Sequence, residues 1–339
     1  MKNPSTRSTR SIGPFQVSSI GLGCMNLSHA YGTPPSPEAA ERVLLAALDA
    51  GVTLFDTAAL YGFGANETLV GRVLKAHRSR FTLASKGGMA GVQFDDGIQR
   101  VIDGRPETLR RNCEDSLRRL QTDVIDLYYL HRWDKKVPIA ESVGALGELV
   151  RAGKVRSIGL SEVSAATIRK AHAEHPIAAV QTEYSPWSRN PEIAVLDTCR
   201  EIGAAFVAFS PVARGFLCDA LPDVATLEAK DIRRGMPRFA PDAYAANLQL
   251  LPAYRALAHE ADCTPAQLAL AWLLHKAPDI IPIPGTTSVA HLHEDLAAAQ
   301  VQLSPSVCER LEALINQHTV TGARYNAQSS TEVDTEEFV

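Results

Sequence analysis

Residues 36–58 read SPEAAERVLLAALDAGVTLFDTA, in which a helix signal is followed directly by a short apolar run. Ser36 is a favoured N-cap residue, Pro37 fits the first helical turn, and apolar residues then recur at helical spacing up to Gly51. The run 52–58 has the near-continuous apolar character of a strand buried on both faces of a parallel sheet. This stretch therefore predicts a helix–strand unit.

The same unit recurs from one end of the chain to the other. Further helix signals begin at Pro106, Thr264 and Ser304. The runs expected to form strands are Val17–Met25, Val52–Ala58, Phe81–Lys86, Ile125–Arg132, Val155–Glu162, Ala178–Ser185, Ala204–Pro211 and Ile280–Thr286. Strands that alternate with helices in this way predict an α/β protein with the (β/α)8 TIM barrel fold.

Three segments do not fit the repeat. Residues 8–16 predict an N-terminal β-hairpin that caps the bottom of the barrel. Residues 214–250 predict a long loop after strand seven, and long loops often carry function. The tail 319–339 is polar. Because no linker or composition break divides the chain, we expect a single domain over residues 1–339, with the barrel at about 16–318.

The composition excludes several classes of protein. Hydrophobic residues make up 45% of the 339 residues and charged residues 21%, which is typical of a folded globular chain. The net charge of −4 provides no basic field for a nucleic acid or an anionic membrane. No apolar run is long enough to span a bilayer, and residues 1–13 contain no apolar signal segment. The 6 cysteines lack metal or redox spacing, so we expect no metal and a cytoplasmic location.

Polar side chains that suit acid–base chemistry follow three consecutive predicted strands. Asp56 and Tyr61 follow the second strand, Lys86 ends the third, and His131 lies near the end of the fourth. Catalytic groups of such barrels lie at the carboxyl ends of strands. A phenol is too weak an acid at neutral pH unless a cation stabilises its anion, and Lys86 supplies that cation. Singly each residue could be structural, but together they form a unit able to protonate a substrate oxygen.

The stretches around these residues resemble the catalytic stretches of the aldo-keto reductase superfamily. They read FDTAALYG (55–62), ASKGG (84–88) and YYLH (128–131). The resemblance continues in family order through GLSE (159–162), QTEYS (181–185), FSPVARG (209–215) and IPGT (283–286). It is closest to bacterial and plant reductases that carry Glu after the Ser of strand five. It implies a (β/α)8 barrel that reduces aldehydes or ketones to alcohols with NAD(P)H.

The resemblance also assigns roles to individual residues. Tyr61 would be the general acid, Lys86 and Asp56 would tune it, and His131 would orient the substrate. Ser161, Glu162 and Gln181 match the positions that hold the nicotinamide carboxamide. Phe209 matches the aromatic residue on which the nicotinamide ring stacks. The positions that match the pyrophosphate site are Ser210, Val212, Arg214 and Gly215, and those of the adenosine end are Gly285, Thr286, Thr287, Ser288, His291, Glu294 and Asp295.

Two departures from the family pattern concern the cofactor. An ionised Glu162 can only accept hydrogen bonds, whereas an Asn there could also donate one. Asp295 replaces the Asn that is usual near adenine. His291 stands where an arginine is common, so the resemblance implies a weak preference for NADPH, with NADH as a possible second cofactor.

The pair Gly21 and Gly23 also matches the start of a dinucleotide-binding fingerprint. The third glycine of that fingerprint is absent, and no helix start follows directly. We interpret the pair as a tight turn at a strand end, which would place Gly23 and Met25 beside the cofactor ribose.

Six residues at or just past strand ends are candidates for an apolar and aromatic substrate pocket: Met25, Asn26, Tyr31, Met89, Trp133 and Trp187. Such a pocket would suit small-molecule substrates that are aromatic or bulky aliphatic carbonyl compounds. Arg132 and Arg189 are the candidates for a carboxylate clamp, and sequence position places neither of them. We make no prediction of the oligomeric state.

Two other functions fit part of the pattern. A barrel aldolase would use Lys86 as a Schiff base and would need no nicotinamide. A non-catalytic, redox-sensing subunit would bind the nicotinamide cofactor without turnover. The four intact acid–base residues favour the reductase.

Overall fold

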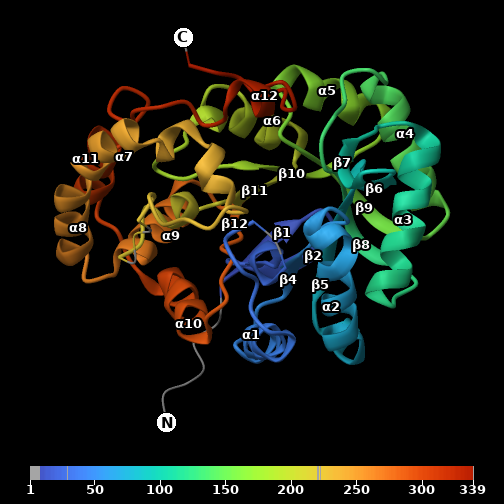
Figure 1. Ribbon diagram of the computed structural model, residues 1–339, viewed down its shortest axis with the longest axis horizontal. Helices are drawn as coiled ribbons and strands as arrows, with labels where there is room; N and C mark the ends of the chain where they lie inside the picture. Colours follow the sequence, from blue (N-terminus) through green and yellow to red (C-terminus); the bar gives the residue numbers. More distant parts are fainter. Residues whose placement is uncertain (1–7, 29, 220, 222, 339) are drawn as a thin grey trace.

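The computed structural model describes residues 8–28, 30–219, 221 and 223–338 (Figure 1). Among these residues, eight parallel strands form one curled sheet in the order β3-β4-β5-β8-β9-β10-β11-β12. The strands are β3 (Leu22–Gly23), β4 (Leu54–Asp56), β5 (Thr82–Gly87), β8 (Ile125–Leu130), β9 (Val155–Ser161), β10 (Ile177–Glu183), β11 (Ala205–Phe209) and β12 (Ile280–Pro282). The predicted (β/α)8 barrel is confirmed.

The barrel closes where β3 meets the segment at β12. The backbone N–H of Gly21 donates to the carbonyl of Pro282 at 3.0 Å, and that of Gly23 donates to Pro284, also at 3.0 Å. A Cβ atom on Gly23 would lie 2.8 Å from the carbonyl oxygen of Ile283, which is too close for any other residue. The two glycines therefore allow the first and last strands to approach.

The first strand is shorter than predicted. Residues 17–25 do not form one strand, because Val17 and Ser18 belong to β2 (Phe15–Ser18) and Met25 begins a 3₁₀ helix, η1 (Met25–Leu27). β2 is already paired with β1 (Thr9–Ile12) in an antiparallel hairpin, so it cannot also extend the barrel wall.

The N-terminal hairpin plugs the barrel as expected. Ile12 and Val17 have no exposed surface and pack against the inward-facing residues of the strands. Those residues include Leu54, Ala84, Leu127, Tyr129, Ala179, Val207 and Ile281. The interior is thus a packed core, and a ligand can enter only from the carboxyl end of the strands. The expectation that residues 1–13 contain no signal segment lies in part outside the described residues.

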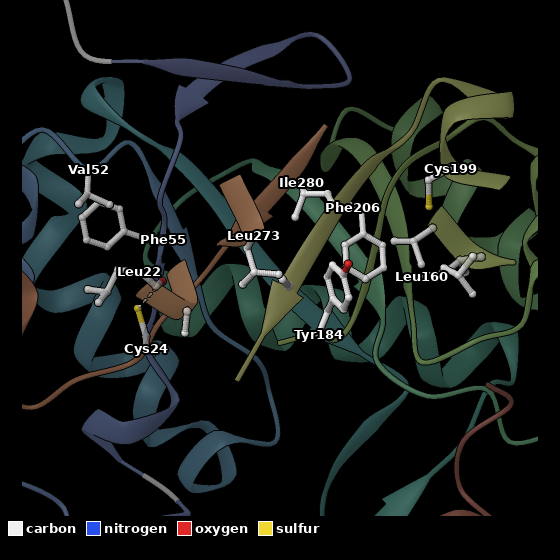
Figure 2. Close-up of a cluster of buried hydrophobic side chains, with 14 of the residues drawn as sticks. Leu22, Cys24, Val52, Phe55, Leu160, Tyr184, Cys199, Phe206, Leu273 and Ile280 are labelled. Atoms are coloured by element: carbon white, nitrogen blue, oxygen red, sulfur yellow. Dashed lines mark hydrogen bonds between the residues drawn. The ribbon is translucent and has the colours of Figure 1, made fainter. Parts of the chain in front are cut away.

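Helices cover the outer face of the sheet (Figure 1). They are α1 (Pro37–Asp49), α2 (Ala65–Leu74), α3 (Pro106–Leu120), α4 (Ile139–Arg151), α5 (Ala165–Glu174), α6 (Val195–Ile202), α8 (Leu251–Glu260), α9 (Pro265–Lys276), α10 (Val289–Ala297) and α11 (Pro305–Leu314). A second hydrophobic cluster fills the space between sheet and helices, and Figure 2 shows Tyr184, Phe206 and Leu160 within it.

The helix caps form as the sequence predicts. The side chain of Ser36 accepts a hydrogen bond from the backbone N–H of Ala39 at the start of α1. Thr264 and Gln267 form both bonds of a capping box at the start of α9. These local bonds fix where the two helices begin.

Three further segments surround the barrel mouth. β6 (Met89–Phe94) and β7 (Gly97–Ile102) form an antiparallel hairpin that the sequence analysis did not anticipate. The long loop after β11 contains short 3₁₀ helices and α7 (Pro241–Leu248). The C-terminal tail carries α12 (Ala327–Ser330) and passes beside α5 and α6 (Figure 1). The backbone N–H of Asp334 donates to the carbonyl of Glu162, so the tail is part of the barrel mouth rather than an appendage.

Gly23→Ala should destabilise the fold by about 1–3 kcal/mol, because its Cβ atom would push the first and last strands apart. Gly144→Ala is the matched control. There the nearest atom to the new Cβ is the flexible carboxylate of Glu174 at 3.3 Å, and alanine favours a helix by about 1 kcal/mol. Urea denaturation measures both variants. Equal stability of the two would show that the barrel seam tolerates a side chain.

Candidate active site

A buried lysine lies at the centre of the barrel mouth. Lys86 ends β5 with no exposed surface. Its ammonium group donates to the carboxylate of Asp56, to the carbonyl of Thr57 at 2.9 Å and to the hydroxyl of Tyr61 at 3.2 Å. Gln181 donates to the second oxygen of Asp56 at 2.8 Å. The structure thus brings Asp56, Tyr61 and Lys86 into one hydrogen-bonded group.

The charges of this group determine its protonation. Burial alone would lower the pKa of Lys86, but the charge of Asp56 and the hydrogen bonds to Asp56 and Tyr61 outweigh it and raise that pKa. Burial raises the pKa of Tyr61 above its ordinary value; Lys86 and Arg132 oppose this shift, and Asp56 adds to it. At neutral pH Lys86 therefore carries a charge and Tyr61 carries its proton.

His131 lies beside the phenol. Its ring meets that of Tyr61 edge to face, with the ring centres 5.8 Å apart. The His131 backbone N–H donates to Gly87 at 2.8 Å, which fixes the end of β8 against β5. Tyr61 itself begins a tight 3₁₀ turn, η2 (Tyr61–Gly64), in which Gly62 and Gly64 have positive φ angles of 56° and 95°. These backbone angles favour glycine, and they hold the phenol beside Lys86.

Two buried residues that support the site were not identified from the sequence. Asn66 accepts from the hydroxyl of Thr57 at 2.6 Å and donates to the carbonyl of Cys24 at 2.8 Å. Glu67 accepts from the hydroxyl of Ser85, the neighbour of Lys86, and pairs with Arg119 at 2.6 Å. Both lie in the first turn of α2. The only sign of them in the sequence is that they are polar residues at the start of a helix that must pack on the barrel.

A cavity of about 540 Å³ adjoins the hydrogen-bonded group of Asp56, Tyr61 and Lys86. Of the residues expected to bind substrate, Met25, Asn26, Tyr31 and Met89 line it. Of those expected to bind cofactor, the lining includes Gly23, Ser161, Gln181, Phe209, Ser210, Val212, Arg214, Gly215 and Gly285. A volume of this size is typical of small-molecule sites.

Other expected site residues lie outside the cavity lining. Trp187 is buried in an aromatic cluster, stacked on Phe216 with ring centres 4.3 Å apart. Trp133 donates its indole N–H to Val137 at 2.7 Å. Neither tryptophan lines the cavity, so the structure does not support the prediction that they form the substrate pocket. The adenosine-end candidates Thr286, Thr287, Ser288, His291, Glu294 and Asp295 lie on or just before α10, next to Gly285.

Glu162 has a partner that its expected role did not include. Both oxygens of its fully buried carboxylate accept from Arg324, at 2.9 and 2.7 Å, and one also accepts from the backbone of Glu183. Glu162 is absent from the cavity lining. The position of Glu162 at a strand end suggested a contact with a ligand. In the structure, Arg324 of the C-terminal tail forms a salt bridge with its carboxylate.

A second buried ion pair lies next to this one. Arg214 donates to the carboxylate of Glu183 at 2.6 Å, and both side chains are almost fully buried. Burial alone would raise the pKa of Glu183, but Arg214, Arg324 and Arg238 hold it below its ordinary value. The side chain of Arg214 is thus engaged with the protein, although the residue is part of the cavity lining.

Comparison with known proteins agrees with this geometry. The model of the aldo/keto reductase family matches residues 19–316. The chain belongs to this family. It is 42% identical to the probable aldo-keto reductase 1 of Glycine max over 317 residues, which cover 92% of this chain and 89% of that protein.

Two other relatives support the assignment. The aldo-keto reductase yakc [NADP(+)] of Schizosaccharomyces pombe is 42% identical over 322 residues, 94% of either chain. Among solved structures, the glycerol dehydrogenase AKR11B4 of Gluconobacter oxydans superimposes with a TM-score of 0.84 at 27% identity, covering 93% of this chain and 97% of that one. The barrel is therefore that of an aldo-keto reductase.

No three His, Cys, Asp or Glu residues in the part of the chain that the structure describes are arranged to hold a metal ion. No helix in the same part of the chain has the length and apolar character needed to cross a membrane.

Arg324→Ala should destabilise the protein by about 3–5 kcal/mol, because it leaves the carboxylate of Glu162 buried without a counter-charge. Arg169→Ala removes a solvent-exposed ion pair with Glu201 and should leave the urea midpoint unchanged. A loss for Arg324→Ala no larger than that of the control would mean that the tail does not stabilise the barrel mouth.

Asp295 should make stability depend on pH. Burial, together with the charge of Glu294, raises the pKa of Asp295 to about 7 from an ordinary 3.8. The unfolded chain therefore loses this proton at lower pH than the folded one, and stability falls as pH rises from about 4 to 7. Asp295→Asn removes the penalty, so its stability relative to wild type should increase by about 2–3 kcal/mol between pH 5 and pH 8. An equal difference at both pH values would contradict this.

Proposed function

We propose that this aldo-keto reductase reduces aldehydes or ketones to alcohols with a nicotinamide cofactor, using Tyr61 as the general acid. The observation that carries the proposal is the hydrogen bond from Lys86 to the hydroxyl of Tyr61, within a buried group that also contains Asp56. This arrangement adjoins the cavity, where a carbonyl oxygen can reach both Tyr61 and His131.

The polar groups of the cavity suit a nicotinamide carboxamide. The Ser161 hydroxyl accepts from Arg132 at 3.1 Å, which leaves its own hydrogen free to donate to a ligand. The amide nitrogen of Gln181 donates to Asp56, so its carbonyl oxygen is the end that can accept. One donor and one acceptor complement the C=O and NH₂ of a primary carboxamide. When bound, the reduced nicotinamide supplies a hydride to the carbonyl carbon.

The rest of the cofactor would lie along the mouth towards α10. Phe209, at the end of β11, offers a ring for stacking, and Ser210, Val212, Arg214 and Gly215 form the adjoining edge of the cavity. Ser210 and Arg214 have positive φ angles of 49° and 58°, and such backbone conformations concentrate at ligand sites. Ser288 caps α10, whose N-terminus suits a phosphate group.

The proton would move from the Oη atom of Tyr61 to the substrate oxygen. Because burial keeps the phenol protonated at neutral pH, the proton is available for reduction. The ammonium group of Lys86 then stabilises the phenolate that remains, and Asp56 keeps Lys86 charged. His131 provides a second polar group at the same oxygen.

The alternative functions fit the geometry less well. A Schiff-base mechanism needs a free amine, but the ammonium group of Lys86 makes three hydrogen bonds and has no exposed surface. A purely redox-sensing subunit would require the cofactor site but not a proton donor beside it. The intact group of Asp56, Tyr61, Lys86 and His131 therefore favours catalysis.

The cavity supports an aromatic or bulky aliphatic carbonyl compound as substrate. Met25, Tyr31, Leu60 and Met89 contribute apolar and aromatic surface to its lining. Such surface binds hydrocarbon groups and leaves the carbonyl to the polar groups at the barrel mouth.

Tyr61→Phe should lower kcat for carbonyl reduction by about 10²–10⁴-fold, because the phenol is needed only to protonate the substrate oxygen. The Kd for NADPH should stay near the wild-type value, since no part of the cofactor site is removed. Steady-state kinetics at 340 nm, together with a fluorescence titration of the cofactor, separates the two effects. More than a tenth of the wild-type kcat would exclude Tyr61 as the acid.

NADPH should bind more tightly than NADH, but only modestly. The segment from Gly285 to His291 contains no Lys or Arg to pair with a 2′-phosphate, and the exposed His291 lies in the first turn of α10. Fluorescence titration of the protein with each cofactor measures the two Kd values. A preference for NADPH above about a thousandfold would require a cation outside this segment.

A further inference from the structure

The arginines that line the cavity are not alike. Three of them have a carboxylate partner: Arg100 pairs with Glu332, Arg214 with Glu183 and Arg233 with Asp231. The fourth, Arg132, has no carboxylate within 4 Å among residues 8–28, 30–219, 221 and 223–338. It is therefore the cavity arginine whose charge the described protein leaves uncompensated.

The position of Arg132 is fixed by its neighbours. Its Nη1 atom donates to the carbonyl of His131 at 2.8 Å and to the hydroxyl of Ser161 at 3.1 Å. Nη2 and Nε have no hydrogen-bond partner within the described part of the chain. The side chain is half-buried and lines the cavity, so Nη2 and Nε are the donors that it has left for a ligand there.

The charge of Arg132 lies at the part of the cavity that contains Tyr61 and His131. Asp56 and Lys86 neutralise each other, and Tyr61 is uncharged at neutral pH. Arg132 is close enough to Tyr61 to oppose the upward shift of its pKa. The surroundings of the phenol thus carry a net positive charge, which favours an anionic ligand. The residues proposed to lie beside the cofactor pyrophosphate follow a different strand, β11. Arg189, the other candidate for binding a carboxylate, pairs with Glu192 and does not line this cavity.

We propose that Arg132 binds a carboxylate on the substrate, so that the preferred substrates are carbonyl compounds with a carboxylate close to the carbonyl group. Guanidinium groups hold carboxylates through paired, charge-assisted hydrogen bonds. Because Arg132 directly follows His131, a carboxylate bound to it lies near the carbonyl that Tyr61 and His131 contact. Oxo acids and short or aromatic aldehyde acids meet this requirement. This inference rests on the proposed carbonyl reductase function.

The test compares each acid with its neutral amide, which has nearly the same shape. The pairs are phenylglyoxylate with phenylglyoxylamide and pyruvate with pyruvamide, each assayed with NADPH at 340 nm. Wild type should favour at least one acid by tenfold or more in kcat/KM. Arg132→Leu should lower kcat/KM for that acid by about 10- to 100-fold, the range expected for a lost charge-assisted bond. The loss for the amide should be at least tenfold smaller than the loss for the acid, because only the acid has a carboxylate for Arg132 to bind.

Two controls separate this role from others. Arg151→Leu makes the same change in charge on the exposed surface of α4 and should alter neither substrate. The Kd of NADPH should be unchanged in Arg132→Leu, since a rise would mean that Arg132 serves the cofactor instead. An equal loss for acid and amide, or a wild type that favours the amides, would overturn the proposal while leaving the reductase function intact.

A binding measurement keeps the inference testable if no carbonyl compound is reduced. That outcome would reject the proposed function, yet the charge of the cavity would still be measurable. Calorimetric titration of the NADPH-loaded protein should then show binding of benzoate but not of benzamide, and loss of benzoate binding in Arg132→Leu. Equal binding of both compounds, or of neither, would overturn the carboxylate site itself.

Discussion

The barrel mouth is organised around one buried charge. An ammonium group without exposed surface is costly unless its hydrogen bonds and its charge are satisfied, and Lys86 meets this requirement through Asp56, Thr57 and Tyr61. Satisfying it fixes the ends of β4 and β5 and the turn that carries the phenol. The same bonds place Lys86 where it opposes the effect of burial on the pKa of Tyr61, which is what the proposed proton transfer requires.

Other buried ion pairs shape the wall of the cavity. Glu162 and Glu183 lie at neighbouring strand ends, and each binds an arginine from a segment outside the barrel repeat. The carboxylate of Glu162 is bound by Arg324, a contact that its strand-end position did not predict. Arg132 is the contrasting case, because its charge faces the cavity. The distribution of paired and unpaired charges therefore defines the ligand surface more closely than strand-end position does.

Sequence reasoning succeeded where the signals act over a few residues. The caps at Ser36 and Thr264 formed as predicted, since each is a hydrogen bond between residues three apart. Seven of the eight strand predictions differ from the observed strands mainly at their ends. The prediction of the first strand was wrong because Val17 belongs to an apolar run like those of the barrel strands, yet it pairs within the N-terminal hairpin. Strand pairing depends on a distant partner, which apolar pattern alone does not specify.

The sequence by itself determined the barrel, the family resemblance and the group of Asp56, Tyr61, Lys86 and His131, because apolar periodicity and motif order are properties of the chain. Only the tertiary structure decided that Arg324 binds Glu162, 162 positions away, and that Arg132 faces the cavity without a counter-charge. It also decided that Trp133 and Trp187 lie outside the cavity. The physical reason is that charge compensation and cavity lining are set by distance in space, and residues far apart in the chain leave no local pattern of their meeting.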